Sequence, residues 1–222
     1  MCTIAIMGNG PIDHVPDLKP YEEHVDIWIG ADRGALILIE NEITPNYAIG
    51  DFDSIQTEQR ELIVDKAIHF EAYPAEKNET DLELAIQKAR NMNPEKIYFF
   101  GVTGGRLDHA LINMQLLYNV VDRNIRGIII DRWNQLELTK PGKHTVRKSV
   151  RYPYISFVPF SKHVKNLSLT GFYYPLTNYD ISWGSTRCIS NELMSQEGTF
   201  SFETGLLFII KSCDNDSDHM HV

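Results

Sequence analysis

The sequence predicts a domain of alternating strands and helices followed by an all-β domain. Short apolar runs alternate with helical segments in the first part of the chain, and the helical periodicity is lost after Lys140-Pro141-Gly142. The second part holds apolar runs rich in Thr, Ser, Tyr and Phe that glycines punctuate. The first pattern favours a mostly parallel sheet and the second an antiparallel β-sandwich. We therefore expect an α/β domain at residues 1–140, a β-sandwich at 141–213 and a disordered tail at 214–222.

Six short apolar runs in the first part are interpreted as strands. They lack a clean alternation, which is typical of strands buried on both faces. The runs are residues 3–7, 26–30, 47–50, 67–72, 97–101 and 127–130. With helices between them they form an α/β/α, Rossmann-like arrangement.

Four helices are expected between these strands: residues 34–41, residues 57–65, one from Thr80 and one from near Asp108. The clearest begins at Thr80, which forms a capping box with Glu83. Apolar residues then recur at helical spacing on one face: Leu82, Ala85, Ile86 and Ala89. The last helix carries a similar apolar face: Ala110, Met114, Leu117 and Val121.

The second part shows no helical pattern, and its apolar runs are interpreted as antiparallel strands. The runs are residues 154–160, 164–174, 181–190, 199–203 and 206–212.

Composition limits the function of the chain. Its 222 residues carry a net charge of −9, which argues against nucleic-acid binding because phosphate neutralisation needs clustered Lys and Arg. The three cysteines, Cys2, Cys188 and Cys213, are far apart and form no CxxC, which fits a reducing cytoplasm. No segment has the length of a membrane span or the features of a signal peptide. We expect a cytoplasmic protein with neither membrane nor nucleic acid as a partner.

Aspartates follow four of the predicted strands. Asp32, Asp51 with Asp53, Asp81 and Asp108 each come after a different strand. Because ligands of open α/β sheets bind beyond the carboxyl ends of the strands, these side chains would form one acidic pocket. Like charges repel, so such a pocket would need a cation.

Asp51 and Asp53 are the best candidate metal ligands. If residues 51–53 are extended, the two carboxylates share a side and Phe52 points away. Hard oxygen ligands favour Mg²⁺, which takes its remaining ligands from water and substrate phosphates. The structural alternative is a turn in which Asp53 or Ser54 caps the next helix.

A glycine-rich loop precedes the last helix of the first part. Gly104-Gly105 would let the backbone approach a phosphate at a helix N-terminus, and Arg106 could bind its oxygens. Asp108 would alternatively be only a helix cap. Asn9-Gly10-Pro11 is interpreted as a turn, and the absence of a G-x-x-x-x-G-K-[ST] pattern excludes a P-loop kinase.

These motifs together resemble the thiamine pyrophosphokinase family. Three segments carry the similarity in the first part: residues 50–55, Lys77 with residues 80–85, and residues 104–109. Residues 171–176, 190–192 and 205–207 resemble the C-terminal marks of the family. The similarity covers nearly the whole chain except its last nine residues.

The resemblance implies the site residues and a homodimer with thiamine bound between subunits. Catalytic and Mg²⁺-binding roles would fall to Asp51, Asp53 and Asp81. The nucleotide site would comprise Asp32, Lys77, Thr80, Gly104, Gly105, Arg106, Asp108 and His109. Thiamine would meet Ser190 and Asn191, and either Tyr174 or Trp183 would stack on its ring.

The expected reaction is transfer of pyrophosphate from ATP to the thiamine hydroxyl, which gives AMP and thiamine diphosphate. Two enzyme alternatives also use a D-x-D motif: a nucleotide-sugar transferase and a haloacid-dehalogenase-type phosphatase. In the latter the motif follows the first strand, whereas here it follows the third. A nucleotide- or thiamine-sensing protein that binds without turnover is the non-enzyme alternative.

Overall fold

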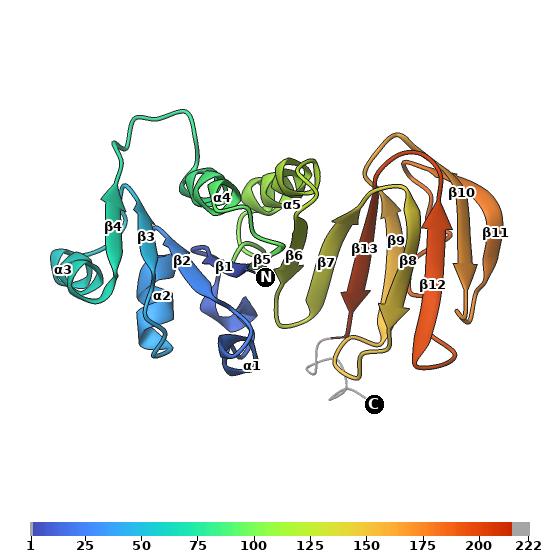
Figure 1. Ribbon diagram of the computed structural model, residues 1–222, viewed down its shortest axis with the longest axis horizontal. Coiled ribbons are helices and arrows are strands. Elements are labelled where there is room, and N and C mark those ends of the chain that lie inside the picture. Colours follow the sequence, from blue (N-terminus) through green and yellow to red (C-terminus); the bar gives the residue numbers. More distant parts are fainter. Residues whose placement is uncertain (1, 215–222) are drawn as a thin grey trace. The chain divides into compact units, whose positions relative to one another are not determined.

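The computed structural model describes residues 2–214, which divide into two compact units (Figure 1). The first unit ends at Arg132 and the second begins at Trp133. The sequence placed the boundary near Gly142, which is the first residue of strand β8 (Gly142–Arg147) and lies in the second unit. Of the predicted tail, residues 215–222 lie outside the described residues. No helix in the described part of the chain is long and apolar enough to cross a membrane.

The sheet of the first unit is parallel and runs in the order β4-β3-β2-β1-β5-β6. Its strands are β1 (Thr3–Met7), β2 (Ile27–Ala31), β3 (Tyr47–Gly50), β4 (His69–Ala72), β5 (Lys96–Phe100) and β6 (Arg126–Ile130). The chain moves outward from β1 to β4 and then returns to place β5 beside the other edge of β1. This reversal creates a switch point between β1 and β5, where open α/β sheets bind ligands.

Helices cover both faces of this sheet, with α4 and α5 on one face and α2 on the other (Figure 1). The helical segments are η1 (Ile12–His14), α1 (Lys19–Glu22), α2 (Gly34–Glu40), α3 (Thr57–Lys66), α4 (Asp81–Asn91) and α5 (Leu107–Val121). As predicted, Thr80 caps α4, because its side chain accepts a hydrogen bond from the Glu83 N–H. All four residues predicted for the apolar face of α4 are buried.

The predicted strands of the first unit are buried as their sequences indicate, except for the edge strand β4, which has no fully buried residue. Ile6, Ile29, Ile49 and Ile97 are fully or almost fully removed from solvent. Burial of an aliphatic side chain of this size stabilises the folded state by about 1.5–3 kcal/mol. This apolar interior fixes the strand ends from which the polar site residues project.

The second unit is antiparallel, and its strands form two groups. β13 pairs with β7 and β9, while β10 and β12 are the inner strands of the order β11-β10-β12-β8. The strands not yet located are β7 (Asn134–Thr139), β9 (Tyr154–Pro159), β10 (His163–Thr170), β11 (Leu176–Ser182), β12 (Glu197–Phe202) and β13 (Leu207–Ser212). Phe157, Val164, Leu167 and Leu207 belong to the core between them. The predicted fold class, α/β followed by a β-sandwich, is confirmed.

Two predictions for the second unit are wrong in detail. The strand expected at residues 181–190 does not form, because β11 lies mostly before this range and ends at Ser182, where turns follow. β7 and β8 were missed. β8 and β11 are mostly exposed, so their polar residues give no apolar run to detect.

Candidate functional site

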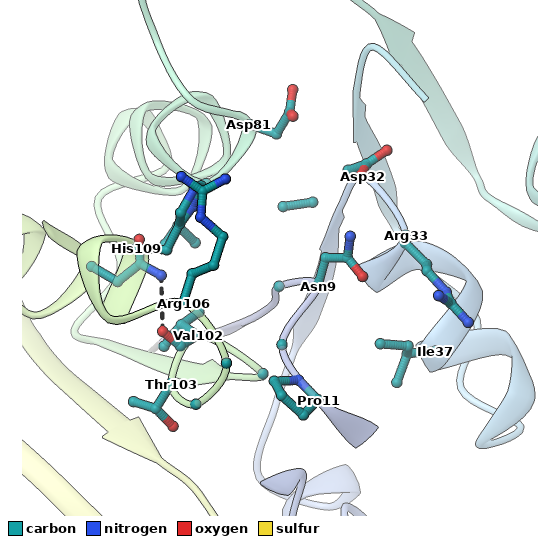
Figure 2. A pocket seen from close by; sticks show the side chains of 18 of the residues that line it. Asn9, Pro11, Asp32, Arg33, Ile37, Asp81, Val102, Thr103, Arg106 and His109 are labelled. Carbon is teal, nitrogen blue, oxygen red and sulfur yellow. Dashed lines mark hydrogen bonds between the residues drawn. The ribbon is translucent and has the colours of Figure 1, made fainter. Parts of the chain in front are cut away.

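A pocket of about 690 Å³ opens at the switch point of the first unit (Figure 2). The segments that follow β1, β2 and β5 line it, together with the first residues of α4. Asp32 and Asp81 lie along one side of it in Figure 2, and Thr103 and Pro11 lie at the opposite end. The lining includes the predicted metal ligand Asp81 and several of the predicted nucleotide residues: Asp32, Thr80, Gly104, Gly105, Arg106 and His109. Four other predicted residues are outside the lining: Asp51, Asp53, Lys77 and Asp108.

The segment after β1, which was interpreted as a turn, is part of the pocket wall. The Gly10 N–H donates to the Gly101 carbonyl at 2.7 Å. A Cβ at Gly10 would lie only 2.7 Å from that same oxygen, so the close approach requires glycine. The pairing brings Asn9 and Pro11 beside the glycine-rich loop, here residues 101–106.

The glycine-rich loop follows β5 and leads into α5. Gly104 and Gly105 have φ angles of +84° and +65°, which glycine adopts without strain. Arg106 is the N-cap of α5, so the predicted cap Asp108 instead lies in the first turn. Backbone N–H groups at such a helix start suit an anionic ligand.

Arg106 and Asp108 are paired with each other on the surface. Arg106 Nη2 lies 2.6 Å from Asp108 Oδ2, and Arg106 Nε donates to Asp108 Oδ1 at 3.2 Å. The hydrogen bonds from Arg106 lower the pKa of Asp108 to about 2. Exposed ion pairs contribute little to stability, so a phosphate could replace Asp108 as the partner of the guanidinium at small cost.

Lys77 connects the predicted catalytic carboxylates. Its Nζ donates to Asp51 Oδ2 at 2.7 Å and lies 3.0 Å from Asp81 Oδ1. The Lys77 and Asp51 side chains are only 12% and 15% exposed, so solvent screens this pair less than a surface pair. Asp51 directly follows β3, whereas Asp81 begins α4. Lys77 therefore joins two elements that enter the site from different directions.

Of the two conformations considered for Asp51-Phe52-Asp53, the structure has the turn and not the extended segment. Phe52 has a φ of +58°, and the Asp53 N–H donates to Asp51 Oδ1 at 3.2 Å, as in a turn. Phe52 does point away from the carboxylates, because it is buried and stacks on Phe70 at 4.7 Å. The alternative cap is also wrong, since Gln56 is the N-cap of α3.

Charge repulsion shapes the ionisation of this cluster. The hydrogen bond from Lys77 lowers the pKa of Asp51. The negative charge of Asp51 in turn raises the pKa of Asp53. Burial raises the pKa of Asp81, and the Lys77 ammonium opposes that rise only in part. Burial would lower the pKa of Lys77 itself, but its two carboxylate partners outweigh burial and raise it. One positive charge, that of Lys77, thus faces several carboxylates and neutralises their negative charge only in part.

Asp32 Oδ1 is buried and lacks a hydrogen-bond partner among the described residues, whereas the buried Asp81 Oδ1 has only the Lys77 ammonium, at 3.0 Å. The other oxygen of Asp32 accepts from Ser54 Oγ at 2.9 Å. Within residues 2–214, no three Asp, Glu, His or Cys side chains converge as a ready metal site. The unsatisfied Asp32 oxygen and the excess of negative charge therefore fit a cation that arrives with substrate phosphates, as Mg²⁺ commonly does.

The residues predicted to bind thiamine lie in the second unit. Asn191 is buried, and its side chain holds the backbone of Tyr174 by two hydrogen bonds, from Tyr174 N at 3.0 Å and to Tyr174 O at 2.8 Å. Ser190 has a φ of +54°, and its N–H donates to Ser156 Oγ. Tyr174 is 61% exposed and Trp183 is 66% exposed. Asn191 therefore places Tyr174, but not Trp183, beside the Ser190 segment.

Sequence reasoning missed some residues of the pocket. Arg33 and Ile37 line its wall from the start of α2, as Figure 2 shows. Thr103 and Asn113 contribute from the glycine-rich loop and from α5. Arg33 directly follows the predicted Asp32, and that adjacency was the one available signal.

The fold and pocket define an α/β protein with an acidic, cation-compatible site at the switch point of its parallel sheet. Residues 18–129 match the family model described as the catalytic domain of thiamin pyrophosphokinase, and residues 143–207 match its vitamin B1 binding domain. The chain belongs to the thiamin pyrophosphokinase family.

Relatives support this assignment over the full length of the chain. A thiamine pyrophosphokinase of Bacillus subtilis is 46% identical across 96% of this chain and 100% of its own length. The crystal structure of the Bacillus subtilis protein has a TM-score of 0.91, with 47% identity over 96% of this chain and all of that one. A Geobacillus thermodenitrificans thiamin pyrophosphokinase has a TM-score of 0.86 at 45% identity, over 96% of this chain and 99% of that one.

Proposed function

We propose that the chain is a thiamine pyrophosphokinase, a transferase that moves the pyrophosphoryl group of ATP to the hydroxyl of thiamine. The products would be AMP and thiamine diphosphate. The observation that carries the proposal is the Asp51–Lys77–Asp81 arrangement beside a pocket at the β1/β5 switch point. It combines an anion-binding lysine with carboxylates suited to a cation, as a polyphosphate substrate requires.

The pocket would bind ATP, with its phosphates directed toward the glycine-rich loop. Gly104 and Gly105 leave room for close approach of the phosphates, and the start of α5 supplies backbone N–H groups. Arg106 would exchange Asp108 for phosphate oxygens. Lys77 would add a second positive charge near the transferred group.

The reaction requires positioning and charge stabilisation more than covalent chemistry from the protein. The thiamine oxygen would form a bond to the β-phosphorus, and the bond between that phosphorus and the oxygen bridging to the α-phosphate would break. The hydroxyl proton would pass to solvent or to the carboxylate of Asp51 or Asp53. Asp51, Asp53 and Asp81 would hold Mg²⁺, which when bound supplies positive charge to the phosphate oxygens.

Tyr174 is the better candidate for stacking on thiamine. Asn191 fixes the Tyr174 backbone at both its N–H and its carbonyl, and Ser190 precedes Asn191 in the chain. Trp183 instead donates its indole N–H to the Phe160 carbonyl at 3.2 Å. An exposed aromatic ring on a fixed backbone suits a flat cationic ligand.

A homodimer with the thiamine site at the subunit interface is part of the proposal. Its support within the first unit is an exposed apolar surface on α5, formed by Leu107, Leu111 and Tyr118. Exposed apolar surfaces of this kind mark interaction sites. Light scattering coupled to gel filtration would show a species of twice the chain mass, whereas a monomer at micromolar concentration would contradict the dimer. Cytoplasmic location and the exclusion of nucleic acid remain predictions from the sequence.

The direct test is to incubate the protein with ATP, thiamine and Mg²⁺ and to follow AMP and thiamine diphosphate together. Equal amounts of both products, lost on addition of EDTA, are expected. ADP with thiamine monophosphate would show attack at the γ-phosphorus instead. Nucleotide binding without either product would favour the sensing protein, and turnover of a nucleotide sugar would favour the transferase alternative.

A further inference from the structure

A buried carboxylate, Asp131, is hydrogen-bonded to the glycine-rich loop. Thr103 Oγ1 donates to Asp131 Oδ2 at 2.7 Å, and the two residues are 9% and 4% exposed. Asp131 directly follows β6, whose last residues are buried isoleucines. Burial of a carboxylate among apolar side chains is unfavourable unless the carboxylate is hydrogen-bonded. Packing of the core therefore gives no reason for an aspartate at this position, whereas a hydrogen bond to the loop does.

The glycine-rich loop requires support from outside itself. Gly101, Gly104 and Gly105 all have positive φ angles, and glycine loses more backbone freedom on ordering than any other residue. A segment with three such residues in five positions would sample many conformations unless other elements held it.

Three different elements hold three consecutive residues of this loop. The Gly101 carbonyl accepts from Gly10 N at 2.7 Å, in the segment after β1. The Val102 carbonyl accepts from Asn113 Nδ2 of α5 at 2.8 Å, the dashed line of Figure 2. The Thr103 side chain is held by Asp131 at the end of β6. Thr103 is thus the last anchored residue before Gly104 and Gly105 line the pocket.

We propose that Asp131 is a positioning residue for the nucleotide: through Thr103 it holds the glycine-rich loop in the conformation that receives the phosphates. This inference rests on the proposed function of the pocket as a nucleotide site. Without the Asp131–Thr103 hydrogen bond, the loop must be ordered when the ligand binds, and that ordering lowers affinity. The thiamine site lies on residues of the second unit and should not respond.

The test compares four single variants and one double variant. The single variants are Thr103→Val, Thr103→Ser, Asp131→Ala and Asp131→Asn, and the double variant combines Thr103→Val with Asp131→Ala. Valine has the shape of threonine without the donor, whereas serine keeps the donor. Asp131 takes part in further interactions, so the decisive pair is Thr103→Val against Thr103→Ser. The probe is a non-hydrolysable ATP analogue with Mg²⁺, measured by calorimetry, with thermal unfolding recorded for each variant.

Thr103→Val is expected to weaken binding of the analogue by about fivefold to tenfold, the effect of one lost hydrogen bond. Thr103→Ser and Asp131→Asn should keep most of the wild-type affinity for the analogue, because each retains the hydrogen bond. The double variant Thr103→Val with Asp131→Ala should lose no more than the weaker-binding single variant, because both act through one contact. In turnover assays the KM for ATP should rise while the KM for thiamine stays constant.

Three results would overturn the inference, and they are distinguishable. If wild-type protein binds the analogue and Thr103→Val binds it equally well, Asp131 does not position the loop. If wild-type protein fails to bind the analogue at all, the proposed nucleotide site is wrong, and the inference falls with it. Equal rises of KM for ATP and for thiamine would show a general structural effect and would also overturn it.

Discussion

At the scale of single residues, the site depends on how Lys77 divides its charge between Asp51 and Asp81. The lysine keeps several carboxylates close together before any cation binds. Repulsion among them still raises the pKa of Asp53, so compensation is incomplete. Such stored electrostatic strain is typical of sites that await a charged ligand.

Replacement of Asp81 should separate activity from stability. Asp81→Asn removes a predicted cation ligand without changing side-chain size, so turnover should fall by about a hundredfold or more. Stability should stay constant or rise by up to about 1 kcal/mol, because burial and the charge of Asp51 both disfavour the Asp81 carboxylate. Product formation and urea denaturation would measure the two effects.

A matched control for Asp81→Asn lies in the same first turn of α4. Glu83→Gln makes the same charge change outside the pocket lining. Activity near that of the wild type is expected for this variant. If Asp81→Asn also turned over normally, Asp81 would have no part in cation binding.

Some site residues could be predicted singly and others could not. Asp32, Asp51 and Asp81 follow or begin elements that the sequence reveals, so their convergence at one sheet edge could be foreseen. The positive φ of Phe52 and the contact between Thr103 and Asp131 could not, because both depend on packing between residues distant in sequence. Lys77 was identified through the resemblance, whereas its ion pairs with Asp51 and Asp81 are visible only in the structure.

At the scale of elements, the sequence predicts a helix or strand correctly where several local signals indicate the same element. α4 carries a cap, an apolar face and acidic residues in its first turn, and it formed where predicted. β11 lacks such agreement, because most of its side chains are exposed and polar. Its place in the sheet comes from pairing with β10, which is a tertiary property that a single sequence pattern does not encode.

The cap of α4 should contribute both to stability and to the site. Thr80→Ala removes the acceptor for the Glu83 N–H, so the free energy of unfolding should fall by about 1 kcal/mol. Because Asp81 is the next residue, fraying of this turn should also lower turnover. Thr80→Ser keeps the hydroxyl and should stay close to the wild type in urea denaturation. Equal stability of the alanine and serine variants would show that the cap contributes nothing.

At the scale of the whole molecule, the proposed sites for the two substrates lie on different units of the chain. The pocket is lined only by residues of the first unit, and Ser190, Asn191 and Tyr174 belong to the second. The sequence predicted this division into an α/β and a β part, although the structure places the boundary before β7. That boundary is hard to foresee, because β7 is a strand like its neighbours on both sides.

Hydrogen exchange should therefore locate each substrate separately. A non-hydrolysable ATP analogue with Mg²⁺ should slow exchange at residues 8–12 and 101–106, and thiamine should slow it at residues 171–174 and 189–192. A ligand at a hundred times its Kd adds about 2.7 kcal/mol to the free energy of opening, so exchange through opening there should slow by about a hundredfold. Tyr174→Ala should abolish the effect of thiamine and leave that of the nucleotide.

Trp183→Ala is the comparison variant, because the Trp183 indole is engaged with the Phe160 carbonyl and not with the Ser190 segment. It should keep most of the thiamine-induced protection. Protection that survives in Tyr174→Ala but disappears in Trp183→Ala would reverse the choice of stacking residue. Thiamine-induced protection confined to the first unit would remove the second unit from substrate binding altogether, because the ligand would then contact only the pocket at the β1/β5 switch point.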